Sequence, residues 1–596
     1  MSTALQVIRV ERVSMASDGT EADGPSSFPS ISADGRYVAY ESYAGNLGPG
    51  DPDFGNTNIF LFDRETGTTA RLTTGEGFSH LPSISADGRY VAFFTETPMI
   101  RNGHFDPVVD SFVFDRQTDT ATLVPVESSD IEQNAYDADP SISADGRYVA
   151  YYSYSQTLVP GDTNGSSDIF VLDRQTNTTE RVSVASDGTE SNFDSNNAAI
   201  SADGRFVTYQ SAATSLVPGD TNGAWDVFVF DRQTDTNQRV SVASDGAEAN
   251  GSSSVGSISA DGRFVTFTSD ASNLVAGDTN GASDVFVFDR QTSTTTRVSV
   301  AGDGTEANGP SGDVSDYGPN ASISISADGR FVAYRSDASN LVSGDTNGVS
   351  DVFVFDRQAS TTTRVSVAGD GTEANGPSAG VSEYGPTGGV SISADGRFVS
   401  FHSDASNLVA GDTNGLTDVF VVRIDVAPEV DGVVKDGDDT DNILEGTRRD
   451  DILRGHDGND LLFGHKGDDR LEGGSGNDRI FAGKGDDTVL GGRGNDLIWT
   501  GKGSDLIAFN EGDGRDRVVD FEHRGHANGN NFDRVQLDVS IGGNHIDDFA
   551  ELEALVASGD IGLNTSKGGL TLTFDDGDAL TLRGVHALSA EDWLFT

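Results

Sequence analysis

Alternating apolar and polar positions dominate the first 425 residues of the chain. Short stretches such as RYVAYYS (147–153), DIFVLDR (168–174) and TTERVSV (178–184) are rich in β-branched and aromatic residues, and Asp-Gly or Asp-Arg-Gln-Thr turns separate them. This pattern is typical of short antiparallel strands joined by tight turns. We therefore expect an all-β region built from four-stranded meanders.

The meander recurs seven times. The pentapeptide Ser-Ala-Asp-Gly-Arg begins at spacings of 53 to 67 residues, at Ser32, Ser85, Ser143, Ser201, Ser259, Ser326 and Ser393. Four strands per unit at this period predict the blade of a β-propeller. The seventh unit stops after its third strand, DVFVVRID (418–425), whereas the chain starts on a sequence like a fourth strand. Residues 7–14 are therefore predicted to complete blade seven and leave no open sheet edge.

A second rhythm follows a linker at 426–436. Residues 473–496 read GGSGNDRIFAGKGDDTVLGGRGND, and the frame GGxGxDxUx runs through eight copies from Gly437 to Ala508 without an insertion. A period of nine is neither helical nor that of strand alternation. The glycine-rich half favours a turn, because glycine adopts positive φ, and x-U-x favours a short strand with one inward aliphatic residue. With two copies per coil, residue i lies over residue i+18, which predicts a parallel β-roll.

The acidic position of the repeat forms two columns on opposite edges of this roll. It is Asn442 in the first copy and then Asp451, Asp460, Asp469, Asp478, Asp487, Asp496 and Asp505. Carboxylates stacked at the strand spacing of about 4.8 Å repel one another. Calcium would neutralise them, since it accepts six or more oxygens at roughly 2.3–2.6 Å. One aliphatic residue in nine is a small core, so metal binding is expected to supply most of the folding energy, and the degenerate first coil is open to interpretation as a cap.

Three stretches resemble known families. The nonapeptide resembles the calcium-binding repeat of RTX proteins, and SISADGRYVAYES with IFLFDRETGTTARLT resembles the TolB-type propeller repeat. Residues 509–596, which close on EDWLFT, are similar to the C-terminal region of type I secretion substrates. These resemblances imply a propeller at 1–425, a calcium roll at 437–508 and a secretion domain at 509–596. They also imply several bound Ca²⁺ ions and export by a type I apparatus to the extracellular space.

The composition of the chain limits the classes of partner that it is expected to bind. The formal charge of −56, with a pI near 4.2, argues against nucleic acid and favours cations. There are no cysteines, which excludes disulfides and sulfur-ligated zinc. The sequence shows neither a basic-then-apolar N-terminal signal peptide nor an apolar run long enough to span a membrane.

Two further features of the propeller are candidate ligand sites. The Asp-x-Asn-Gly-x-x-Asp loops, with Asp162, Asn164 and Asp168 as the example, resemble part of a calcium loop. They offer only two carboxylates and one amide, so a structural turn is the favoured interpretation and a cation site the alternative. Blades six and seven carry nine-residue insertions with Tyr317 and Tyr384, side chains suited to sugars or peptides. No catalytic constellation is recognisable. We expect a secreted calcium-binding protein whose propeller binds an extracellular glycan or protein, with a secreted hydrolase or lyase as the alternative.

Overall fold

The structure is a computed structural model of the full chain, and its contacts divide it into two units, Ser2–Ala427 and Pro428–Thr596. Each unit is described by itself. The structure describes residues 5–48, 56–73, 77–97, 100–101, 104–105, 108–124, 138–312, 322–369, 371–380, 389–426, 432–438, 440–510, 512–521 and 533–537, and short segments between 552 and 595.

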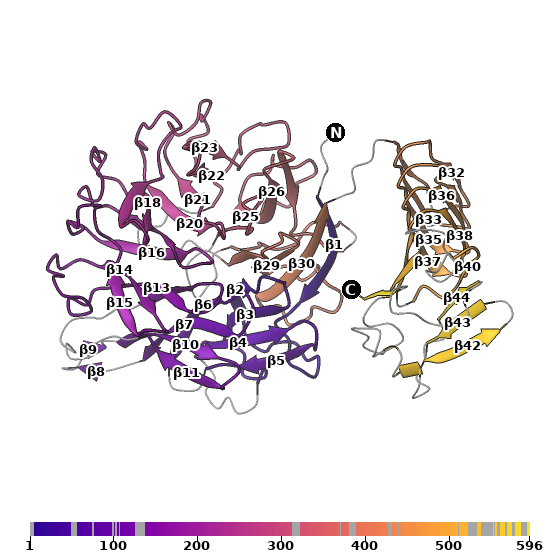
Figure 1. The fold of residues 1–596 in the computed structure, drawn as a ribbon, viewed down its shortest axis with the longest axis horizontal. Coiled ribbons are helices and arrows are strands. Elements are labelled where there is room, and N and C mark those ends of the chain that lie inside the picture. The colour runs from indigo at the N-terminus through magenta and orange to yellow at the C-terminus, as the bar shows by residue number, and fades with distance from the viewer. Residues whose placement is uncertain are drawn as a thin grey trace. The chain divides into compact units, whose positions relative to one another are not determined.

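The first unit is a seven-bladed β-propeller (Figure 1). Each blade is a four-stranded antiparallel sheet. The first three blades along the chain are β2 (Ser26–Ile31), β3 (Tyr37–Ser42), β4 (Asn58–Asp63) and β5 (Thr68–Arg71); β6 (Phe78–Ile84), β7 (Tyr90–Thr97), β10 (Val108–Asp115) and β11 (Thr120–Leu123); and β12 (Ala138–Ile142), β13 (Tyr148–Ser153), β14 (Asp168–Asp173) and β15 (Thr178–Arg181). A two-stranded hairpin, β8 (Ile100–Arg101) and β9 (His104–Phe105), extends blade two.

The next three blades repeat this order. They are β16 (Ser195–Ile200), β17 (Phe206–Ser211), β18 (Asp226–Asp231) and β19 (Thr236–Arg239); β20 (Ser253–Ile258), β21 (Phe264–Ser269), β22 (Asp284–Asp289) and β23 (Thr294–Arg297); and β24 (Ile323–Ile325), β25 (Phe331–Ser336), β26 (Asp351–Asp356) and β27 (Thr361–Arg364).

Blade seven joins the two ends of the propeller sequence. It contains β28 (Val390–Ile392), β29 (Phe398–Ser403), β30 (Asp418–Val426) and, as its outer strand, β1 (Leu5–Arg12), which pairs antiparallel with β30. Ala33 N donates to Ala86 O, and the same bond links each blade to the next until Ala394 N donates to Ala33 O. A ring of seven backbone hydrogen bonds therefore passes through the Ser-Ala-Asp-Gly-Arg turns.

The other residues of this pentapeptide also hold neighbouring strands together, as blade three shows. Ser143 Oγ donates to Asp145 at 2.8 Å and accepts from Tyr148 N at 2.9 Å. Gly146 has φ +70°, and a Cβ there would lie 2.1 Å from the ring of Tyr90 in the preceding blade. Arg147 pairs through two nitrogens with the Asp173 carboxylate, at 3.0 and 2.6 Å. Lysine cannot form this planar, two-pronged pair, which explains why the last residue of the pentapeptide is arginine in all seven copies.

The second unit is a parallel β-roll of two sheets. One sheet contains β31 (Val434–Asp436), β33 (Ile452–Asp457), β35 (Arg470–Gly476), β37 (Thr488–Gly494), β39 (Leu506–Phe509), β41 (Arg534–Leu537) and β45 (Trp593–Phe595). The other contains β32 (Ile443–Glu445), β34 (Leu461–Phe463), β36 (Arg479–Lys484), β38 (Leu497–Lys502), β40 (Arg515–Val518) and β44 (Ala579–Leu582), followed by the antiparallel pair β43 (Gly569–Thr573) and β42 (Gly562–Ser566).

The aliphatic position of the repeat fills the space between the two sheets. Leu471 lies over Val489, and Ile480 lies over Ile498, in parallel register 18 residues apart. The inward column is fully or almost fully buried from Leu453 to Ile507. The predicted all-β propeller and parallel roll are thus confirmed. Among the described residues there is no helix of the length and apolarity that crossing a membrane requires.

Candidate calcium-binding site

The aspartates of the repeat form two buried columns in the roll. Asp478 N donates to Asp496 Oδ1, and Asp469 N donates to Asp487 Oδ1, both at 2.8 Å. The same bond links each aspartate from Asp451 to Asp487 to the one 18 residues later. Each of the seven predicted aspartates exposes 2% or less of its surface. The columns are therefore built by the coil itself, with one carboxylate oxygen used as a backbone acceptor.

The second oxygen of these carboxylates has no partner in the described part of the chain. The orphaned Oδ2 atoms belong to Asp460, Asp469, Asp478, Asp487, Asp496 and Asp505. A methyl group added to Gly473 would lie 2.4 Å from Asp478 Oδ2 and 2.5 Å from the carbonyl oxygen of Gly491. A methyl group added to Gly455 or Gly464 would lie similarly close to the Oδ2 atom of Asp460 or Asp469, respectively, and to a carbonyl oxygen of the next coil. Carboxylate and carbonyl oxygens of successive coils thus converge on one small space, which fits a hard cation such as calcium.

The electrostatics of the columns favour such a cation. Burial raises the pKa of Asp469 to about 7 and that of Asp487 to about 8, and neighbouring carboxylates of the column add to the shift. In the second column, burial raises the pKa of Asp478 to about 6. Without a cation, the roll can keep these groups buried only by protonating them or by tolerating their repulsion.

The turns require glycine at the fourth position of the repeat, which is glycine in the third to eighth copies. Gly476 has φ +142°, and a Cβ there would lie 1.7 Å from the carbonyl oxygen of Gly458 in the preceding coil. Gly494 has the same conformation over Gly476. Only glycine allows coils to stack this closely with their carbonyl groups directed inward.

A family model described as the RTX calcium-binding nonapeptide repeat, in four copies, matches residues 436–471, 472–507 and 482–518. The roll consists of RTX calcium-binding repeats. The repeats of this family bind calcium, and calcium is the kind of ion that the unpartnered Oδ2 atoms would coordinate.

Part of the propeller is similar in sequence to TolB. The Tol-Pal system protein TolB of Francisella tularensis subsp. tularensis (strain WY96-3418) is 35% identical over 72 residues, 12% of this chain and 14% of that protein's length. Among solved structures, TolB from Acinetobacter baumannii has a TM-score of 0.32 at 15% identity, over 57% of this chain and 63% of that one. An oligogalacturonate lyase in complex with manganese has a TM-score of 0.41 at 13% identity, over 71% and 97% of the two chains. Such values carry no information about activity.

The aspartate columns continue beyond the predicted repeats. Asp496 N donates to Asp516 Oδ1 at 2.9 Å, and Asp505 N donates to Asp533 Oδ1 at 3.2 Å. Burial raises the pKa of Asp516, and the facing Asp496 raises it further. Asp516 is preceded by GDGR and followed two residues later by the buried Val518. It is therefore the acidic residue of a ninth nonapeptide, which begins two residues later than the frame of the first eight predicts. A search of the sequence that allowed this two-residue shift would have identified Asp516. Asp533 could not be identified in this way, because no glycine turn precedes it.

The Asp-x-Asn-Gly-x-x-Asp loops of the propeller are arranged around arginine. The Arg181 guanidinium lies 3.0 Å from Asp162, 3.3 Å from Asp168 and 2.8 Å from Glu190. Asn164 Nδ2 donates to Asp168 Oδ2 at 2.8 Å. Burial raises the pKa of Asp162 to about 6. The predicted residues are brought together, but a cationic side chain already lies among them; the same cluster surrounds Arg12, Arg239, Arg297 and Arg364.

A small cavity of about 170 Å³ lies among the inner strands of the propeller, and sequence reasoning did not foresee it. The inner strands of the first four blades each contain a bulge with one non-glycine residue at positive φ, namely Phe28, Leu81, Asp139 and Asn197. All four line the cavity. Such strained positions are often found at binding sites. Tyr317 and Tyr384 lie outside the described residues, although Gly389, which follows the second insertion, also lines the cavity.

The raised pKa values predict that acid stabilises the metal-free roll. These aspartates ionise near 3.8 when unfolded and at about 6 to 8 in the fold, so ionisation destabilises the fold as the pH rises through this window. In chelator, far-UV circular dichroism should show more β-structure at pH 5 than at pH 8. Asp469→Asn with Asp487→Asn should flatten this dependence. A wild-type signal that is unchanged between the two pH values would contradict the interpretation.

Asp516 should behave as a calcium ligand. Asp516→Asn keeps an acceptor for Asp496 N but removes a charge, so calcium affinity should fall by at least about tenfold, or one ion should be lost. Isothermal titration of the full chain measures both. Asp486→Asn is the matched control, because Asp486 is exposed and its carboxylate accepts from Ser504 N at 2.8 Å, the one hydrogen bond it has among the described residues. Equal effects of the two variants would remove Asp516 from the site.

Proposed function

We propose that the protein is an extracellular calcium-binding protein whose RTX roll folds when calcium binds and whose propeller holds a partner. The orphaned Oδ2 atoms of the roll carry this proposal, since the six buried carboxylate oxygens that lack a partner among the described residues destabilise an ionised, metal-free roll. At low calcium the roll would remain unfolded, and at millimolar calcium it would fold.

Export by a type I apparatus follows from the same behaviour. An unfolded roll suits passage through a channel, and calcium outside the cell would then fold it. The residues proposed as the export signal include β45, which pairs in parallel with β41 at Val535↔Trp593. Folding of the roll would therefore place part of the signal in a β-sheet and oppose its return through the channel.

The propeller cavity is the proposed site for the partner. Its wall is mostly apolar, with Phe28, Leu81 and Val255 around the half-buried carboxyl of Asp139. Burial raises the pKa of Asp139 to about 7. In the described part of the chain no hydrogen bond or ion pair holds this carboxyl. A ligand that places a cationic group on an apolar body would supply the missing charge.

Catalysis has weaker support. Glu41 accepts from Ser27 Oγ at 3.1 Å and lies 3.2 Å from His80 Nδ1, a grouping that suggests acid–base chemistry. However, the carboxylate lies between the serine and the histidine. Nucleophilic catalysis requires the base to contact the nucleophile directly. This pair instead joins blade one to blade two, because Glu41 also accepts from Leu81 N at 3.4 Å.

Deleting residues 537–596 should abolish export. The truncated chain loses the proposed signal, so it should accumulate inside a cell that carries a type I apparatus, whereas wild type appears in the medium. Asp478→Asn with Asp487→Asn is the control: it weakens calcium binding and leaves the signal intact, so export should persist. Secretion of the truncated chain at the wild-type level would refute this part of the proposal.

Asp139→Asn should abolish partner binding by the propeller. Asparagine tolerates the left-handed backbone at this position, so the fold should be kept while the charge is lost. A glycan and matrix-protein array would show ligands lost by this variant, and wild-type binding should weaken below about pH 7 as Asp139 is protonated.

The control is Asp119→Asn, which removes an exposed carboxylate at a similar φ of +55°. If the Asp139→Asn variant still binds every array ligand that the wild type binds, the partner site is not in this cavity. Tyr317→Ala with Tyr384→Ala on the same array would test the two insertions.

A further inference from the structure

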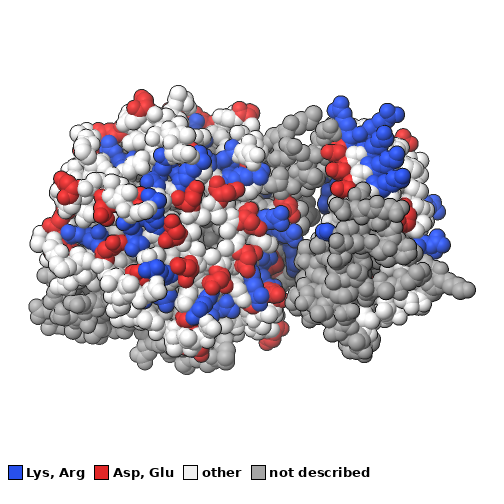
Figure 2. Space-filling model, in the orientation of Figure 1, with Lys and Arg blue, Asp and Glu red and all other residues white. Residues whose placement is uncertain are grey.

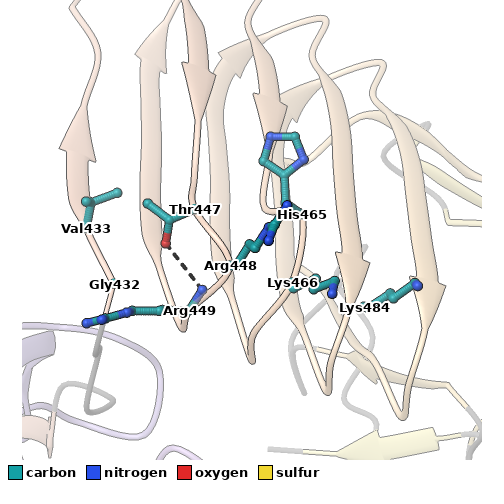
Figure 3. A pocket seen from close by; sticks show the side chains of 8 residues that line it. All are labelled: Gly432, Val433, Thr447, Arg448, Arg449, His465, Lys466 and Lys484. Carbon is teal, nitrogen blue, oxygen red and sulfur yellow. Dashed lines mark hydrogen bonds between the residues drawn. The ribbon is translucent and has the colours of Figure 1, made fainter.

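A column of basic side chains follows one edge of the RTX roll. It occupies the third position of alternate nonapeptides, so its members are 18 residues apart: Arg448, Lys466, Lys484 and Lys502. All four are exposed. Figure 3 shows the first three on successive turns of the roll, and Figure 2 shows Lys and Arg gathered over this part of the unit. We refer to these four residues as the basic ridge.

The ridge is not needed for the metal sites. Both edges of the roll carry a column of buried aspartates, yet the other edge has Asp457, Ser475 and Arg493 at the equivalent position. In the described part of the chain, no ridge residue forms an ion pair. Three of the five lysines of this strongly acidic chain belong to the ridge. Neither folding nor calcium binding explains a row of unpaired cations on one edge.

The carboxylates near the ridge accept hydrogen bonds from backbone groups of the roll. Asp486 N donates to Asp468 Oδ1 at 2.8 Å, and Asp468 N donates to Asp450 Oδ1 at 2.7 Å. Their oxygens thus serve the backbone of the next coil along the roll axis. They offset part of the positive charge but leave the ammonium groups of the ridge available to an external anion.

An aromatic ladder accompanies the ridge. Phe463, Phe481 and Trp499 each precede a ridge lysine by three residues. The Phe463 and Phe481 rings stack at 5.1 Å and 13°, and the Phe481 and Trp499 rings at 4.3 Å and 8°. The inward neighbours Leu462, Ile480 and Ile498 are buried, so the half-buried ladder lies on the outer face of its sheet. His465, which stacks on Phe463 at 6.1 Å, extends it toward a hollow of about 890 Å³ lined by Arg448, Lys466 and Lys484.

We propose that the basic ridge and the aromatic ladder together bind a linear acidic polysaccharide. Successive lysines are one coil apart, at about the strand spacing of 4.8 Å, which is of the same order as the length of one sugar unit. A uronic acid chain offers one carboxylate per unit to the lysines and apolar ring faces to the aromatic residues. A nucleic acid would match the charge, but the acidic remainder of the chain would repel its longer and denser array of phosphates.

The test uses the full chain with calcium and an end-labelled oligogalacturonate too short to gel with calcium. Fluorescence anisotropy should detect binding that weakens with added salt. Lys466→Gln, Lys484→Gln and Lys502→Gln combined should weaken it by roughly tenfold or more. Lys435→Gln, Arg479→Gln and Arg493→Gln remove equal charge away from the ridge and should change it by less than about twofold. Phe481→Leu should weaken binding in an otherwise folded roll.

Three results would overturn the inference: equal losses in the two triple variants, equal affinity for a neutral maltooligosaccharide, or equal affinity for a single-stranded oligonucleotide. The inference requires a folded roll but not a ligand in the propeller. Failure of calcium to change the circular dichroism would count against the proposed function. Failure of a calcium-folded roll to bind oligogalacturonate would count only against the ridge.

Discussion

A buried carboxylate needs a positive partner, and the two units of this protein meet that need in different ways. In the propeller the partner is arginine, as in the Arg147–Asp173 pair and in the cluster of three acids around Arg181. In the roll the second oxygen of each aspartate from Asp460 to Asp505 has none among the described side chains. The propeller therefore carries its own counter-charges, whereas the described part of the roll supplies none for these aspartates.

The same contrast explains how the sequence relates to each fold. The seven pentapeptides and the eight nonapeptides predict propeller and roll because each repeat places one residue type at one structural position. Asp469 and Asp487 could be paired by counting 18 residues, and the structure joins them by that register. Asp516 could not be predicted by counting 18 residues from Asp496, because it lies 20 residues later. Asp533 could not be predicted because no glycine turn precedes it.

Other features depend on contacts that no short pattern encodes. The arginine of each cluster and its third acid, such as Arg181 and Glu190, come from outside the loop that supplies the other two acids. A reading of Asp162, Asn164 and Asp168 alone therefore suggests a metal loop. Phe28 and Leu81 are unusual residues for positive φ, and nothing local predicts their bulges. The basic ridge is regular but hidden, since its period is two nonapeptides and adjacent copies lie on opposite edges of the roll.

The pairing of β1 with β30 also has a consequence for the order in which the propeller forms. Blades one to six are built from neighbouring segments, so each can form as soon as its own residues are available. The strand at Leu5–Arg12 must instead wait for Asp418–Val426, more than 400 residues later. Until that strand arrives, β1 has no partner and the edge of β29 stays open to other chains. The pairing of β1 with β30 thus spans the longest sequence separation in the propeller, and general folding behaviour makes such a late contact slow and the open edges before it prone to aggregation.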